Sequence, residues 1–501
     1  SGDEEEEEEE EAGRSRRQQD EEPATSCTVF AQWREVVEAA HGNVLERSRR
    51  AVNVIQRLCR TVKNGQLPKP YVVALARCLH GGFYIRLNLL WKPCAETLGV
   101  ILERYLMDDE LWGVLWSQLT SAQTELLSWS KEEAAADRRE REAASTAEPG
   151  VAEEAFREAV TLGMSGMAAT GAADPTDAQF RLKQMLQALQ HAPGATSRHS
   201  QALVTLLLQF TGPKARGGGV WRSALREWLG LLSSMNGGRG LRGPTGGNEV
   251  RELLERLLVD PDPGVQTLSI ACLRQWRLAH FTPYAERLER LAKPETLKEE
   301  LVSFQVQRVS DTGEAAMILE EHRLQLVPLL LRVLFPSLRK RSGSAQVKGS
   351  LSSIRATVLN FCCALEPSEL SELVRLVLEP FQLAFIVDPL KAQRKDHERF
   401  FASVDVAALR DIPAKRLIGF LQTVMDVVRH LGTRIAPHVP HLVAVVVRIY
   451  VLAGTEQEGT APQLAKGKEL RSFALKVLIT VLEHHPRFEL DVYWPTLVSA
   501  I

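Results

Sequence analysis

Apolar residues recur along much of the chain at the three- and four-residue spacing of an amphipathic helix. After Val250 they fall at Leu253, Leu254, Leu257 and Leu258, which lie on one face of a helix. Three further stripes have the same spacing: Leu324, Val327, Leu331, Leu334, Phe335 and Leu338; Leu417, Phe420, Leu421, Val424, Val428 and Leu431; and Leu470, Phe473, Ala474, Val477, Leu478, Val481 and Leu482. Because most of the stability of such a helix comes from packing its apolar face, each stripe needs a partner helix.

The breaks between the stripes are short and rich in proline. Residues 260–266 read Asp-Pro-Asp-Pro-Gly-Val-Gln, so one helix ends at this turn and the next begins after it. This turn resembles the corner between the two helices of a HEAT unit. The first helical turn tolerates proline, and we expect five prolines to lie near helix starts: Pro93, Pro328, Pro437, Pro440 and Pro495.

Short breaks between amphipathic helices favour antiparallel helix pairs over a βαβ fold. We therefore predict an all-α fold, an irregular α-solenoid of HEAT or armadillo type with a degenerate repeat of about 40 to 47 residues. The β-branched run at 443–447 is the one ambiguous strand signal, and its position after two prolines favours the second helix of a pair.

The composition divides the chain into four parts. We predict an acidic disordered tail at 1–25, helical repeats at 26–130, a charged, alanine-rich linker at 131–175, and HEAT-type repeats at 176–501. Inserted loops are expected near 212–219, 236–247, 339–353 and 453–468, where glycine, serine and charged residues gather.

The net charge of −2 hides an asymmetry between the tail and the rest. Asp3 and the glutamates at 4–11 contribute −9, which leaves +7 on the remaining residues. A block of like charges is typical of a solvated, disordered segment, with competition for basic partners as the alternative. The chain begins at Ser1 without methionine and stops at Ile501 inside an apolar pattern, so we expect a fragment of a longer protein.

Nothing in the sequence indicates secretion or a membrane span. The first 25 residues are polar and acidic, and the longest apolar run, at 442–452, is too short and contains Arg448. The seven cysteines are scattered without a CxxC pair, which is typical of reduced, buried thiols in a cytosolic or nuclear protein.

Candidate catalytic and metal-binding patterns are weak. The GxGxxG match at 238–243 is followed by Pro244 and lacks a preceding strand, so it is interpreted as a loop. His438 with His441 and His484 with His485 are close pairs without a cysteine cluster, and we expect helix-end or surface roles for them. Trp91, Trp112, Trp116, Trp276 and Trp494 occupy apolar helical positions and are expected in the core. We expect no catalytic residues, no cofactor and no metal.

Basic residues in the predicted loops are the strongest candidates for a binding site. Cations in such segments can neutralise RNA phosphates without reading the base sequence. The alternative is that they only stabilise the negative ends of helix dipoles and keep the loops solvated. The candidate RNA contacts are Arg339, Lys340, Arg341, Lys348, Arg239, Arg242, Lys214 and Arg216.

Several strings resemble one family. They are the Phe-Tyr-Ile-Arg-Leu-Asn-Leu-Leu-Trp-Lys-Pro run at 83–93, the corner at 260–266, Pro283-Tyr284, His322-Arg323 with the basic loop at 339–348, Glu379-Pro380-Phe381, and the helix pair at 419–450. Together they resemble the small-subunit processome component 20 family, also called down-regulated in metastasis. The resemblance covers roughly 30–130 and 180–501, and it is most specific at 250–379. Its members are several times longer than this chain.

The resemblance implies a HEAT-repeat scaffold in the nucleus, in the nucleolus, that bridges processome proteins, pre-rRNA and a guide snoRNA within a large ribonucleoprotein complex. The resemblance implies no catalytic residues and no membrane partner. It does not extend to the acidic start or the glycine-rich inserts, so it assigns them no role. Two alternatives stay open: a HEAT-repeat transport receptor or adaptor scaffold, and the helical accessory region of an enzyme. Transport receptors tend to be strongly acidic, whereas the body of this chain is mildly basic.

Overall fold

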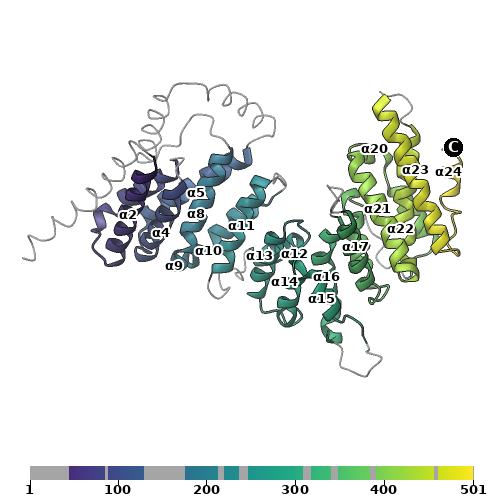
Figure 1. The fold of residues 1–501 in the computed structure, drawn as a ribbon, viewed down its shortest axis with the longest axis horizontal. Coiled ribbons are helices and arrows are strands. Elements are labelled where there is room, and N and C mark those ends of the chain that lie inside the picture. The colour runs from purple at the N-terminus through teal and green to yellow at the C-terminus, as the bar shows by residue number, and fades with distance from the viewer. Residues whose placement is uncertain are drawn as a thin grey trace, which may run out of the picture. The chain divides into compact units, whose positions relative to one another are not determined.

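The fold is known from a computed structural model of the chain (Figure 1). It describes residues 44–84, 88–128, 175–212, 219–235, 246–308, 317–339, 348–383, 391–455 and 461–499. Every regular element in these ranges is a helix, so the predicted all-α class is confirmed. The acidic tail at 1–25 and nearly all of the linker at 131–175 lie outside the described residues, as do most of the loops expected near 212–219 and 236–247. Within the other two expected loops, residues 348–353, 453–455 and 461–468 are helical.

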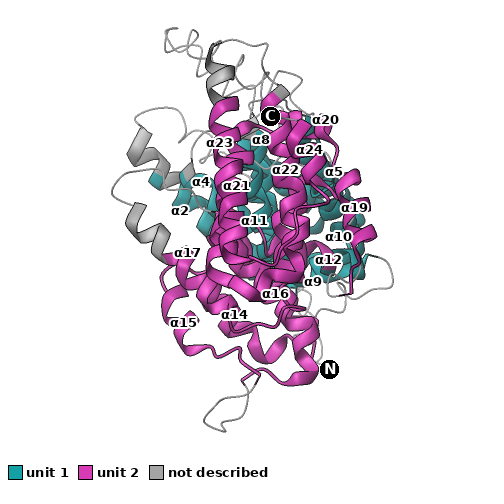
Figure 2. Ribbon diagram, turned by 90° about the vertical axis from the view of Figure 1, so that its right-hand side faces the viewer, with its two compact units in different colours: residues 1–251 teal, residues 252–501 magenta. Residues whose placement is uncertain are grey.

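The chain forms two compact units, residues 1–251 and 252–501, which Figure 2 colours separately. The boundary falls inside helix α12 (Gly247–Leu257). The prediction of four sequence segments concerned composition and repeats, and these two compact units do not test it.

In unit 1 the helices pack against others that lie close to them in the chain. Helix α4 contacts α2 and α3, α8 contacts α4 and α5, and α11 contacts α8. The elements are α2 (Val44–Lys63), η1 (Lys69–Tyr71), α3 (Val72–Gly81), η2 (Gly82–Tyr84), α4 (Asn88–Arg104), α5 (Asp109–Ser128), α8 (Pro175–Gln190), α9 (Pro193–Arg198), α10 (Ser200–Phe210) and α11 (Gly219–Ser234).

Unit 2 repeats this arrangement of paired neighbours. Helix α16 packs against α14, α17 and α18, and helix α21 packs against α17 and α23. The elements after α12 are α13 (Pro263–Arg274), η3 (Thr282–Tyr284), α14 (Ala285–Ala292), α15 (Leu297–Ser303), α16 (Glu320–Arg339), α17 (Lys348–Cys362), α18 (Ser371–Leu378), η4 (Glu379–Phe381), α19 (Arg394–Ser403), α20 (Val406–Arg410), α21 (Ala414–Leu431), η5 (Gly432–His438), α22 (Val439–Thr455), α23 (Ala461–His484) and α24 (Trp494–Ser499).

The proline-rich corner joins helices α12 and α13 as predicted. Asp262 is the N-cap of α13, and its Oδ1 accepts a hydrogen bond from the Gly264 amide at 2.8 Å. The Asp260 carboxylate accepts from the Asp262 amide at 2.9 Å, which closes the turn. Val265 is fully buried directly after the corner, so the turn also starts the apolar face of α13.

Most of the predicted apolar stripes are buried. All of the α12 and α21 positions lie in the core, and so does the β-branched run at 443–447, which is helical and belongs to α22. The prediction is wrong at two positions, because Leu324 is 85% exposed and Leu482 is 39% exposed.

Two of the five prolines are not where the sequence predicts. Pro440 and Pro495 are the second residues of α22 and α24, as expected, and Pro437 lies in η5. Pro93 and Pro328 instead lie inside α4 and α16, which begin one to two turns earlier. A proline inside a helix removes one backbone hydrogen bond, so packing of the surrounding turns must compensate for it.

Helices α21 and α22 form the most apolar part of unit 2. By length and composition the stretch 414–454 could cross a membrane, but 72% of its apolar window is buried inside the protein. The backbone also turns at Gly432, where φ is 49° and the helix is interrupted. Burial of this kind is typical of the core helices of a folded unit.

Candidate functional site

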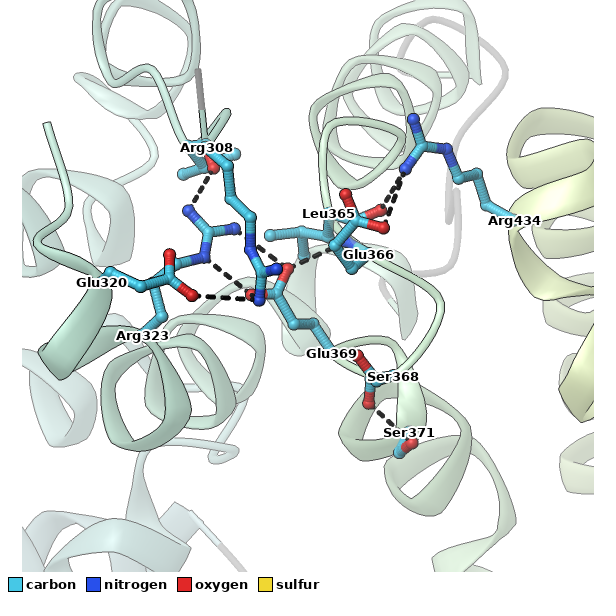
Figure 3. Close-up of polar contacts among 10 residues, drawn as sticks. Arg308, Glu320, Arg323, Leu365, Glu366, Ser368, Glu369, Ser371 and Arg434 are labelled. Carbon is cyan, nitrogen blue, oxygen red and sulfur yellow. Dashed lines mark hydrogen bonds and ion pairs between the residues drawn. The ribbon is translucent and has the colours of Figure 1, made fainter. Parts of the chain in front are cut away.

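The turn at 365–371, between α17 and α18, holds a cluster of charged residues in unit 2 (Figure 3). Arg323 of α16 is 2% exposed, and its guanidinium donates to both carboxylate oxygens of Glu369, from Nε at 2.7 Å and from Nη2 at 2.9 Å. Its Nη1 donates to the Val306 carbonyl at 2.8 Å. One buried arginine therefore joins α16 to the turn and to the segment after α15.

Further contacts complete this turn. The Glu366 amide donates to Glu369 at 2.8 Å, and Arg308 lies 3.9 Å from the same carboxylate. Burial alone would raise the pKa of Glu369, but the hydrogen bonds from Arg323 and Glu366 and the charges of Arg323 and Arg308 outweigh it and lower the pKa. The carboxylate is therefore ionised at neutral pH.

The following helix pair reaches the same turn from its other side. Arg434 of η5 donates to the Leu365 carbonyl at 3.2 Å, and its Nη1 lies 3.6 Å from the Glu366 carboxylate (Figure 3). His438 contacts the Pro367 carbonyl through Nε2 at 2.8 Å. We call residues 365–371 the hub turn, because side chains from successive repeats converge on it.

Other polar side chains join helices in the same manner. Arg332 of α16 contacts Glu372 of α18 at 2.7 Å and Glu255 of α12 at 3.6 Å. Gln266, 3% exposed in α13, donates through Nε2 to the carbonyls of Leu258 at 2.6 Å and Val333 at 3.0 Å. These contacts fix helices of neighbouring repeats at one register.

Unit 1 contains a comparable buried arginine. Arg181 of α8 is 4% exposed, forms an ion pair with Glu125 of α5, and donates to the Tyr84 hydroxyl at 2.9 Å. Gln123 of α5 donates to the Leu206 carbonyl of α10 at 2.8 Å. Buried polar groups of this kind specify which helices pair, because each must find its partner to offset its desolvation.

His438 ends η5 and His441 lies in the first turn of α22, so both are at a helix end as expected, but neither is at the surface. His438 and His441 are both fully buried, and the ring of His441 packs edge-on against Phe400 at 4.6 Å. Burial, with repulsion from His438 and His397, lowers the pKa of His441 to about 4. Within the described residues no cluster of three histidine, cysteine or acidic side chains could hold a metal. His485 is buried and His484 exposed.

The cysteines that the structure describes are mostly buried and unreactive. Burial raises the pKa of the Cys78 thiol to about 11 and the pKa values of Cys94 and Cys362 to about 12. A thiol needs a lowered pKa to act as a nucleophile at neutral pH, so these side chains serve packing.

Most of the predicted RNA-contact residues lie outside the described residues. These are Lys340, Arg341, Arg239, Arg242, Lys214 and Arg216, and the GxGxxG match at 238–243 is also outside. Lys348 begins α17, but its side chain is not among those described. Arg339 ends α16, is exposed, and places its guanidinium over the Phe335 ring at 5.8 Å.

Arg339 also lines a pocket that the sequence analysis did not predict. The pocket has a volume of about 170 Å³ and lies where α16, α17, α18, η4 and α21 meet. We call it the arginine pocket; its lining residues include Arg339, Arg355, Arg416, Phe335, Phe381 and Phe420. The three arginines come from three helices, so no local sequence signal brings them together.

The tryptophans are less buried than expected. Trp494 is 58% exposed, and the other four tryptophans expected in the core are half-buried. Trp112 stacks on His199 with ring centroids 3.8 Å apart. The fully buried tryptophan in the described residues of α11 is Trp228.

A family comparison matches the part of the chain that contains the hub turn. A family model described as "U3 small nucleolar RNA-associated protein 20, N-terminal" matches residues 219–501. The match begins at the first residue of α11 and takes in all of unit 2. The matched residues make up more than half of the chain. It includes the hub turn, the arginine pocket and the segment 250–379 where the resemblance was most specific. The chain therefore belongs to the U3 small nucleolar RNA-associated protein 20 family, whose members are components of the small-subunit processome and act in ribosome biogenesis in the nucleolus.

Proposed function

We propose that this chain is a non-catalytic scaffold that bridges processome proteins and pre-rRNA during assembly of the small ribosomal subunit. A scaffold acts by holding surfaces at fixed separations, so its helices must keep their register under load from bound partners. Solenoids suit this role because stacked repeats offer long continuous surfaces to proteins and RNA.

The hub turn is the observation that carries this proposal. A fully paired, buried arginine at Arg323 links three segments, and Arg434 and His438 connect the same turn to the next helix pair. A buried ion pair adds little net stability over apolar residues of similar volume, and in some proteins it specifies one arrangement of the packed segments. Such links are what a repeat protein needs if its function is to present surfaces in fixed positions.

The basic segment that follows α16 is the proposed point of RNA contact. Arg339 is exposed at the end of the helix, and the sequence continues with Lys340 and Arg341 up to Lys348 at the start of α17. Cations of this kind bind phosphates by charge and position the protein without reading the base sequence.

The test is crosslinking of the protein to RNA in living cells, followed by sequencing of the bound fragments. The test variant reverses four charges: Arg339→Glu, Lys340→Glu, Arg341→Glu and Lys348→Glu. A matched control reverses four exposed cations elsewhere in unit 2: Lys395→Glu, Arg399→Glu, Arg410→Glu and Arg487→Glu.

We expect the unaltered protein to recover small-subunit pre-rRNA and the U3 small nucleolar RNA. The test variant should lose most of this RNA, while the control should retain it. Full recovery by the test variant would remove the loop from the proposal and leave the scaffold role. Absence of pre-rRNA, with transport cargo co-purifying with the protein instead, would overturn the proposed function and favour an adaptor.

A further inference from the structure

The arginine pocket combines an apolar interior with a cationic rim. Phe335 and Phe420 are buried in its wall, and Phe381 stands edge-on to Phe420 with ring centroids 4.7 Å apart. Arg339 and Arg416 are exposed at the ends of α16 and α21 that border the pocket. No acidic residue is among its described lining residues, so its local charge favours an anionic ligand.

One rim arginine is already held in place. Arg355 of α17 has a side chain that is 20% exposed, and its Nη1 lies 3.4 Å from Oδ2 of Asp426 in α21. Gln422 donates to the other oxygen of Asp426 at 2.9 Å, which orients that carboxylate. Arg355 therefore forms a fixed side of the pocket, whereas the exposed Arg339 and Arg416 are the cations available for a ligand's phosphates.

The volume limits what can enter. A cavity of about 150 Å³ holds one benzene molecule, so about 170 Å³ accommodates a single six-membered ring and is small for a fused double ring. Aromatic faces and arginine planes both stack on unpaired bases, and arginine pairs with phosphate in a two-pronged geometry.

We propose that the arginine pocket receives one unpaired pyrimidine nucleotide of single-stranded RNA. The base enters among Phe335, Phe381 and Phe420, and Arg339 and Arg416 contact the phosphates on either side of it. This inference rests on the proposed RNA contact, because Arg339 also begins the basic segment after α16. It adds a preference for single-ring bases, which phosphate contacts alone do not provide.

RNA fits these observations better than an acidic peptide does. The pocket is continuous with the start of the basic segment, and the family to which the chain belongs is associated with a small nucleolar RNA. An acidic peptide with one aromatic side chain would satisfy the same charges, so it serves as a competitor in the test.

The experiment measures binding of fluorescent twelve-residue oligouridylate and oligoadenylate to the whole purified chain by anisotropy. Gly419→Leu fills the pocket from α21 without changing charge, and leucine suits a helix interior better than glycine. Ile412→Trp fills it from another wall and guards against a fold defect peculiar to one variant. Arg416→Glu tests the rim, and Arg399→Glu is its exposed control.

We expect oligouridylate to bind about tenfold more tightly than oligoadenylate, the equivalent of one good stacking contact. Either filling variant should remove this difference, leaving oligoadenylate binding unchanged. Arg416→Glu should weaken both oligonucleotides together, and Arg399→Glu should weaken neither.

Three outcomes would overturn the inference in different ways. If both oligonucleotides bind equally and the filling variants change nothing, RNA contact stands but no base enters the pocket. If the acidic aromatic peptide displaces oligouridylate and is itself excluded by Gly419→Leu, the pocket is a peptide site. If neither oligonucleotide binds in a salt-dependent manner, the RNA contact of the proposed function fails as well.

Discussion

Replacing Arg323 by methionine removes the buried guanidinium that contacts the hub turn and keeps an unbranched side chain as far as the position of Nε. The variant loses three hydrogen bonds, two to Glu369 and one to the Val306 carbonyl. Glu369, whose side chain is 10% exposed, would keep its hydrogen bond from the Glu366 amide and the weaker attraction of Arg308 at 3.9 Å.

The contacts that Glu369 keeps limit how much free energy of unfolding the Arg323→Met variant loses. Removing one partner of a buried ion pair costs about 3–5 kcal/mol, and the contacts that Glu369 retains place Arg323→Met near the lower limit, about 3 kcal/mol. The double variant Arg323→Met/Glu369→Leu leaves no charge without a partner and should cost less than the single change. By contrast, Arg394→Met removes a surface pair with Glu398, both side chains about half exposed or more, and should cost under about 1 kcal/mol.

Hydrogen exchange measured by mass spectrometry reads these changes helix by helix, which suits a chain whose two units need not unfold together. A loss of about 3 kcal/mol speeds exchange of the buried α16 amides about a hundredfold where they exchange through opening of that helix. If Arg323→Met changes exchange no more than Arg394→Met does, or if the double variant equals the sum of its singles, the hub turn is not held by this pair.

Three further predictions concern the corner and the histidines. Gln266→Leu deprives the Leu258 and Val333 carbonyls of their donor and should destabilise unit 2 by about 1–3 kcal/mol in the same exchange assay. Asp262→Ala removes the N-cap of α13 and should cost about 1 kcal/mol, whereas Asp262→Asn should cost little. Because the pKa of His441 is lower in the folded protein than in the unfolded chain, the free energy of unfolding of unit 2 should fall by about 2 kcal/mol between pH 7 and pH 5. Urea titrations at a series of pH values measure this fall, and His441→Gln should reduce it. An unchanged pH dependence in the variant would show that His441 is not its source.

The helical fold was predictable because it depends on short-range periodicity. The stripe beginning at Leu253 and the corner at Asp262 behave as the pattern requires, since apolar spacing and capping act within a few residues. Helix starts were less predictable: proline is favoured in the first turn, yet Pro93 and Pro328 occur inside helices whose packing outweighs the lost hydrogen bond.

The hub turn could not be predicted, because its contacts join residues far apart in the sequence. Apolar periodicity assigns Leu324 to the core, but the structure exposes Leu324 and buries its neighbour Arg323. An arginine can occupy a core position only when a carboxylate and carbonyls meet its donors, and here these come from Glu369 and Val306. The burial of His438 has the same origin, since its ring contacts the Pro367 carbonyl of that turn.

The same contacts bear on why a scaffold would retain charged groups in its interior. Apolar residues of similar volume in place of Arg323 and Glu369 would cost little stability, so stability alone does not account for the pair. Apolar attraction is non-directional, whereas a two-pronged arginine contact is satisfied in one register only. Three such contacts each favour one register between neighbouring helices of unit 2: the ion pair of Arg323, the ion pairs of Arg332 and the hydrogen bonds of the Gln266 amide. Loss of register, more than unfolding, is therefore the defect expected of the Arg323→Met/Glu369→Leu variant. If the chain is the scaffold proposed above, this variant would have nearly normal stability but would no longer hold its partners at fixed positions.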